Sequence, residues 1–66
     1  MQSYTIKTDA DIMTTDAESF DDAARQHDSS VSTADELIQQ CRSVGGWCWI
    51  ERDADGERIG DVTGAE

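Results

Sequence analysis

The sequence predicts a small α+β fold with the order β-α-α-β-β, a three-stranded antiparallel sheet with two helices on one face. Two central segments show helical spacing of apolar residues behind capping signals. The C-terminal third holds two β-compatible segments around an aspartate–glycine turn, and the first residues alternate between apolar and polar. With 66 residues and no proline or linker, we expect one small acidic domain over residues 1–66.

The first element is a short strand. Tyr4 and Ile6 alternate with Thr5 and Lys7, which is the pattern of a half-buried strand. Residues 9–15 are acidic and rich in threonine, and Ile12 and Met13 are their only apolar anchor. We interpret them as an irregular connection, with or without a few extended residues.

The first helix is predicted over residues 16–27. Thr15 and Glu18 have the spacing of a capping box, in which each side chain satisfies a free backbone N–H of the first turn. Four residues then follow at i, i+3, i+4 and i+7 and form the predicted inner face: Phe20, Ala23, Ala24 and His27.

The second helix begins at another capping box, formed by Thr33 and Glu36. Glycines 45 and 46 end it, because glycine readily adopts the left-handed conformation of a helix C-terminus. Its predicted inner face again has helical spacing: Ala34, Leu37, Ile38, Cys41 and Val44.

Residues 47–52 and 57–62 are the predicted hairpin strands, and residues 53–56 have the composition of a turn with a left-handed glycine. We prefer a three-residue loop with a bulge, which pairs Asp53 with Glu57. That register places Ile59 opposite Glu51 on the face of Trp47 and Trp49, and Val62 opposite Cys48. A two-residue loop would reverse these faces.

The charge balance excludes several classes of partner. The chain has fifteen acidic residues and five basic ones, which gives a formal charge of -10. Such a chain has no basic footprint for nucleic acid or anionic lipid. There is no signal-peptide pattern, and the longest apolar run is four residues, so we expect a cytoplasmic protein. In a reducing cytosol the default for Cys41 and Cys48 is a pair of buried thiols, with a disulfide the less favoured alternative.

Metal, cofactor and catalytic motifs are weak. Residues 51–56 resemble the start of an EF-hand calcium loop, but the twelfth position is Val62 instead of glutamate and the flanks are strand-like. Cys41, Cys48 and His27 do not have a structural zinc spacing. No arrangement of residues indicates a catalytic site, so we expect neither enzyme activity nor a cofactor.

The carboxylates themselves are the candidate site. Alternate residues of a strand lie about 6.6 to 6.8 Å apart, comparable with the phosphate spacing along one DNA strand. Glu51, Asp53, Asp55 and Glu57 follow that spacing through the hairpin tip, and Asp21 and Asp22 belong to a second cluster on the first helix. These six residues are the predicted partner-binding site, and the alternative is that they are ordinary solvated faces.

Size, acidity and α/β layout together resemble the small phage-encoded anti-CRISPR inhibitors, several of which are acidic DNA mimics. The resemblance covers the whole chain and involves no sequence motif. It implies a monomeric, stoichiometric inhibitor that binds a basic DNA-recognising protein, such as a Cas subunit of a CRISPR effector.

Two alternatives remain open at this point. The excess of aspartate, with four arginines to one lysine, is also typical of salt-adapted (halophilic) proteins, in which the acids have no partner. The chain is otherwise consistent with a small cytosolic regulatory domain that binds a protein through a hydrophobic contact, either at Trp47 or Trp49 or at the edge of the sheet.

Overall fold

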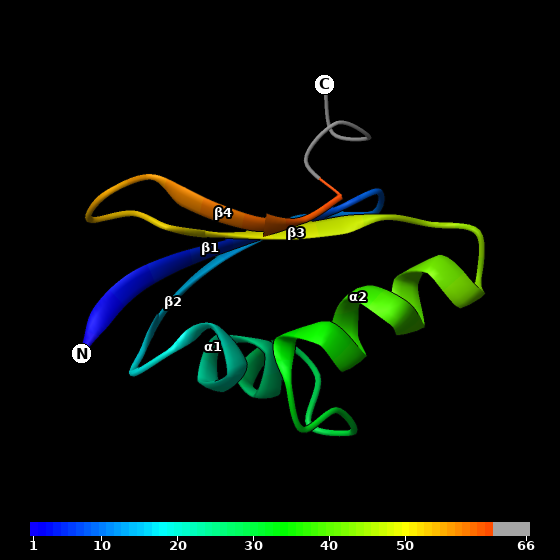
Figure 1. Ribbon diagram of the computed structural model, residues 1–66, viewed down its shortest axis with the longest axis horizontal. Coiled ribbons are helices and arrows are strands. Elements are labelled where there is room, and N and C mark those ends of the chain that lie inside the picture. The colour runs from blue at the N-terminus through cyan, green and yellow to red at the C-terminus, as the bar shows by residue number, and fades with distance from the viewer. Residues whose placement is uncertain (62–66) are drawn as a thin grey trace.

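The computed structural model, which describes residues 1–61, contains four strands and two helices in the order β-β-α-α-β-β (Figure 1). The sheet is antiparallel throughout, with strand order β2-β1-β3-β4, and both helices lie on one of its faces. The elements are β1 (Gln2–Thr8), β2 (Ile12–Ala17), α1 (Phe20–His27), α2 (Ala34–Ser43), β3 (Cys48–Arg52) and β4 (Glu57–Gly60).

The α+β class, the two helices on one face and the pairing of the first strand with the C-terminal hairpin are confirmed. The prediction of three strands was wrong, because residues 12–15 of the expected irregular connection form a strand together with residues 16 and 17. Isoleucine and threonine favour extended backbone, and β2 pairs with β1 over six residues. Thr8 closes the connecting turn: its N–H donates to the Asp11 carbonyl at 2.9 Å, and its hydroxyl accepts from the Ala10 N–H.

Helix α1 is shorter than predicted, because residues 16 and 17 belong to β2. Its N-cap is Ser19 instead of Thr15, and the Ser19 side chain accepts a hydrogen bond from the Asp22 N–H. Asp22 in turn accepts from the Glu18 N–H at 3.0 Å. The predicted inner face is confirmed in its two alanines, which are buried, whereas Phe20 and His27 are half-buried.

Helix α2 begins where the sequence predicts, with the Thr33 side chain accepting from the Glu36 N–H at 3.2 Å. Gly45, with a φ of 82°, follows its end as expected. Most of the predicted inner face is buried or half-buried, but Val44 is 82% exposed, because the helix ends at Ser43 and the chain turns away.

The hairpin between β3 and β4 is confirmed, but the preferred register was wrong. Arg52 pairs with Glu57 across a four-residue loop, and the Gly56 N–H closes it on the Arg52 carbonyl at 2.7 Å. Ile59 therefore lies opposite Ile50 instead of Glu51. The position of Val62 lies outside the described residues.

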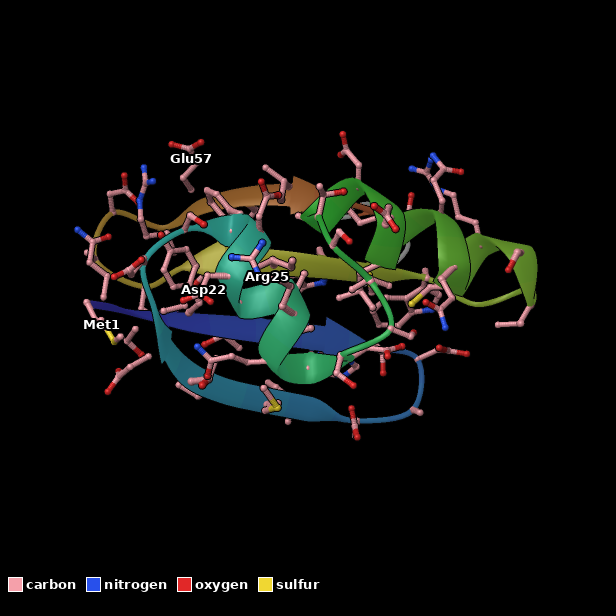
Figure 2. The ribbon with its side chains drawn as sticks, turned by 90° about the horizontal axis from the view of Figure 1, so that it is seen from below. Met1, Asp22, Arg25 and Glu57 are labelled. Atoms are coloured by element: carbon pink, nitrogen blue, oxygen red, sulfur yellow. The ribbon has the colours of Figure 1, made fainter. Side chains whose placement is uncertain are left out.

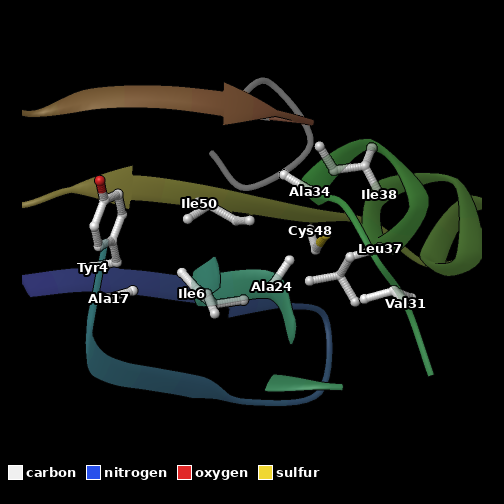
Figure 3. Close-up of a cluster of buried hydrophobic side chains, with 11 residues drawn as sticks. Tyr4, Ile6, Ala17, Ala24, Val31, Ala34, Leu37, Ile38, Cys48 and Ile50 are labelled. Atoms are coloured by element: carbon white, nitrogen blue, oxygen red, sulfur yellow. The ribbon is translucent and has the colours of Figure 1, made fainter. Parts of the chain in front are cut away.

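The core lies between the sheet and the two helices (Figure 3). Ile6, Cys48 and Ile50 from the two central strands are fully buried there, and Tyr4 packs edge-on against Phe20 with ring centroids 5.2 Å apart. Small alanines in α1 and the aliphatic residues of α2 fill the space against the strands. No helix covers the opposite face of the sheet in the part of the chain that the structure describes, and we call it the open face.

Candidate functional site

The structure brings the two predicted acidic clusters to the same end of the molecule. Figures 1 and 2 both place the tip of the β3–β4 hairpin and the connection from β2 to α1 at the same end of the molecule, and Figure 2 shows Asp22 and Glu57 toward that end. We call this region the acidic end and define it by six carboxylates from these two segments: Glu18, Asp21, Asp22, Asp53, Asp55 and Glu57.

Arg52 connects the two halves of the acidic end. Its guanidinium donates to Asp55 at 3.1 and 2.7 Å and to Glu57 at 2.8 Å. It also lies 5.4 Å from the ring centroid of Phe20, the first residue of α1. The hydrogen bonds from Arg52 lower the pKa of Asp55 below its usual range, so Asp55 stays negatively charged. Arg52 thus fixes the hairpin tip against the start of α1.

Asp53 is held by hydroxyl groups instead of an arginine. Ser3 donates to it at 2.8 Å and Thr5 at 2.9 and 3.1 Å, and its N–H donates to the Ser3 carbonyl. These neutral donors fix the Asp53 side chain in position on the hairpin.

The helix carboxylates also have structural roles. Asp21 accepts from the Ala34 N–H at 2.8 Å, which satisfies a free donor of the first turn of α2. Asp22 accepts from the Glu18 N–H, as described above, and lies 3.6 Å from Arg25. Both acids sit in the first turn of α1, where the helix dipole favours negative charge.

The hairpin acids do not form one continuous row. Glu51 lies on the open face, paired with Arg58 at 2.6 Å, and Asp53 contacts β1 residues of the same face. Asp55 and Glu57 instead meet Arg52, whose side chain lies on the helix side over Phe20. The four-residue loop interrupts the strand spacing, so the predicted row divides into two pairs. Glu51 thereby stands outside the acidic end.

Acidic residues also lie elsewhere on the surface. Asp9 and Asp11 flank the β1–β2 turn, and Asp35 and Glu36 begin α2. Each of the four arginines makes an ion pair with an acid, whereas among residues 1–61 several carboxylates have no arginine within ion-pair distance.

The arginine partners were not predicted from the sequence. Arg52 and Arg58 stand next to the acids along the chain, and oppositely charged residues at facing strand positions are a known stabilising pair. That signal could have identified both pairs, but only with the correct hairpin register, in which Glu51 faces Arg58 and Arg52 faces Glu57.

Trp49, one of the two tryptophans considered as a contact residue, is only 7% exposed. It lies on the open face, and the Arg58 guanidinium covers its ring at 4.6 Å from the centroid. Trp47 is half-buried.

Over residues 1–61, no pocket is found and no group of three metal-ligating side chains comes together. Neither helix of this segment has the length and hydropathy needed to cross a bilayer. Comparison with protein-family models, curated proteins and solved structures found no match to this chain.

Proposed function

We propose that this protein is a non-enzymatic, stoichiometric inhibitor that binds a basic, DNA-recognising protein through its acidic end. The class of partner is a DNA-binding effector, such as a Cas subunit of a CRISPR complex, and the acidic end occupies the groove that normally holds DNA phosphates. In this proposal the protein is a phage-encoded, anti-CRISPR-type DNA mimic that acts as a monomer in the cytoplasm of the host cell.

The observation that supports the proposal is the meeting of two acidic clusters, distant in sequence, at one end of a small scaffold. Six carboxylates lie there with two arginines, Arg25 and Arg52, so the region keeps an excess of negative charge. Most of these carboxylates are fixed by hydrogen bonds from the protein itself. Fixed charges lose less conformational entropy on binding than mobile ones.

The test is a competition gel shift. A panel of purified CRISPR effectors is incubated with labelled target duplex and increasing amounts of the protein, at moderate salt. We expect release of the duplex near one equivalent of protein for the effector that is the target. Unchanged duplex binding across the panel would contradict the proposal.

Variants in which aspartates are replaced by neutral asparagines test which surface binds the partner. Asp21→Asn/Asp22→Asn removes two charges from the acidic end and keeps the acceptor oxygens, and the control Asp9→Asn removes a charge from the turn at the other end of the sheet. We expect the first variant to inhibit roughly ten-fold less well, which corresponds to about 1.4 kcal/mol. The second should inhibit like the wild type. Equal losses would indicate that only net charge matters.

The salt-adapted alternative also has a specific observation in its favour, since Asp9 and Asp11 belong to the β1–β2 turn, which lies at the other end of the sheet from the acidic end. A regulatory contact through tryptophan would now depend on Trp47, because Trp49 is covered by Arg58. Loss of binding in Trp47→Ala, with Asp21→Asn/Asp22→Asn unaffected, would favour that function.

A further inference from the structure

The outer edge of β2 has backbone groups that face away from the sheet. In an antiparallel pair, residues alternate between those whose N–H and C=O meet the partner strand and those whose groups point away. The Asp16 carbonyl accepts a hydrogen bond from the Gln26 side chain of α1 at 2.7 Å, so it points away from β1. Ile12 and Thr14 precede Asp16 by four and two residues, and their backbone groups therefore point outward as well.

The pairing on the other side of β1 agrees with this assignment. Ser3 faces Asp16 in the register, and the Ser3 carbonyl accepts from the Asp53 N–H on the β3 side at 3.0 Å. The backbone groups of Ser3 thus point toward β3, which leaves those of Asp16 directed to the free edge.

This edge carries few of the features that usually protect sheet edges. Natural edges are protected by lysine, proline, bulges or a covering segment. β2 contains neither lysine nor proline, and its pairing with β1 is uninterrupted. At one end of the edge, the side-chain amide of Gln26 donates to the Asp16 carbonyl, as the peptide N–H of a neighbouring strand would. At the other end Ile12 is 63% exposed.

We propose that the free edge of β2 binds an extended, positively charged segment of a partner protein, which adds to the sheet as a fifth, antiparallel strand. The proposal rests on the proposed function only for the class of partner, which is a cationic protein. It adds the backbone element, the β2 edge, that binds this partner. A basic residue of the segment lies opposite Asp16, a small polar residue opposite Thr14 and an apolar residue opposite Ile12.

Charge complementarity selects this occupant over a second copy of the chain. Asp16 ends the outward-facing stretch and Asp11 directly precedes it; the Asp11 side chain is 69% exposed and lies 4.0 Å from the His27 ring nitrogen. Two copies joined edge to edge would each bring a formal charge of -10. The two copies would therefore repel each other, whereas the lysine or arginine side chains of a cationic strand would lie at cross-strand distance from carboxylates of opposite charge.

The test uses a synthetic nine-residue peptide with blocked ends, in which arginine, threonine and valine occupy alternate central positions and lysine and threonine fill the rest. The control is the same peptide N-methylated at those three central residues, so that it has the same charge and side chains but cannot donate the strand hydrogen bonds. Each is titrated into isotope-labelled protein to millimolar concentration at 150 mM salt. Amide hydrogen exchange is then measured residue by residue.

We expect the unmodified peptide to slow exchange at the Ile12, Thr14 and Asp16 amides by roughly ten-fold or more near saturation. The N-methylated peptide should not. Thr14→Pro removes an outward N–H without removing a bond to β1, so this variant should stay folded and lose the protection. Equal effects of the two peptides, or no protection by the first, would overturn the proposal.

Two further outcomes are decisive. Protection of these amides in the free protein that grows with protein concentration would identify the occupant as a second copy and refute a cationic partner strand. Peptide protection together with unchanged duplex binding in the gel shift would refute the proposed inhibitor function and leave the strand-binding edge supported.

Discussion

Cys48 is a buried thiol at the first position of β3, on the core side of the sheet. Burial raises the pKa of its thiol to about 12, and a hydrogen bond with the Cys41 thiol acts in the same direction. Both cysteines are free, and Cys41 is half-buried at the end of α2. Cys48 is therefore protonated at neutral pH and a poor nucleophile.

This pKa predicts how stability changes in alkali. The folded-state pKa lies above the ordinary value of about 8.5, so the contribution of Cys48 is complete below that pH and is lost as the pH rises toward the folded-state value. Urea unfolding between about pH 8 and 11 should show a steeper loss of stability for wild type than for Cys48→Ala. Parallel curves for the two proteins would contradict the assignment. As a control, iodoacetamide should modify Cys41 before Cys48.

The carboxylates of the candidate site could be identified from the sequence, but their partners could not. Acidic side chains are visible in composition and spacing. Whether Glu51 is free or paired depends on which residue faces it across the hairpin, and a change of one residue in loop length replaces Arg58 by Ile59. Asp53 likewise contacts Ser3 and Thr5, some fifty residues away in sequence, which no local pattern indicates.

Among the elements, α1 shows how a correct pattern can be assigned to the wrong residue. Thr15–Glu18 and Ser19–Asp22 both have the spacing of a capping box, and only the second begins the helix. The sequence pattern favours the first because it does not indicate β2: a segment with one isoleucine and three acid or hydroxyl residues lacks the apolar alternation of a buried strand. Pairing with β1, a tertiary interaction, determines its structure.

The N-cap assignment is tested by substitution. Ser19→Ala removes the acceptor for the Asp22 N–H and should lower the free energy of unfolding by about 1 kcal/mol. Thr15→Ala removes only a hydroxyl contact with the Gln26 side chain and should cost less. Chemical denaturation of both variants provides the comparison. A larger loss for Thr15→Ala would place the helix start where the sequence pattern first suggested.

The backbone alternation in β2 has its own test. Thr15 faces Tyr4 in the register, and its N–H is directed to β1, whereas the Thr14 N–H is directed outward. Thr15→Pro should therefore lower the free energy of unfolding by about 1–3 kcal/mol through the lost ladder bond, and more than Thr14→Pro does. Equal unfolding midpoints for the two proline variants would show that the alternation is assigned incorrectly.

For the whole molecule, the main electrostatic fact is a formal charge of -10 on 66 residues. Self-repulsion of this size opposes the compact state and is screened by salt, since the Debye length falls from about 10 Å at 0.1 M to about 3 Å at 1 M. The protein should be folded at low salt and gain thermal stability as salt is added. A gain of about 1 kcal/mol corresponds to roughly 4–8 °C for a domain of this size.

Thermal unfolding followed by circular dichroism, from 50 mM to 1 M sodium chloride, measures the effect, and potassium chloride should give the same curve if screening is the cause. A chain that is unfolded at 50 mM salt would contradict this expectation. That outcome would instead favour salt adaptation as the reason for the acids.

The position of β1 between β2 and β3 also determines how the chain folds. The β1–β2 hairpin is local and can form within microseconds, but Tyr4 pairs with Arg52, which lies 48 residues further along. Closing that long loop has a large entropic cost, and the core stays incomplete until it closes. We therefore expect the pairing of β1 with β3 to be the slow step of folding. Substitutions in the β1–β3 pairing should slow refolding, whereas substitutions confined to the β2 edge should mainly accelerate unfolding.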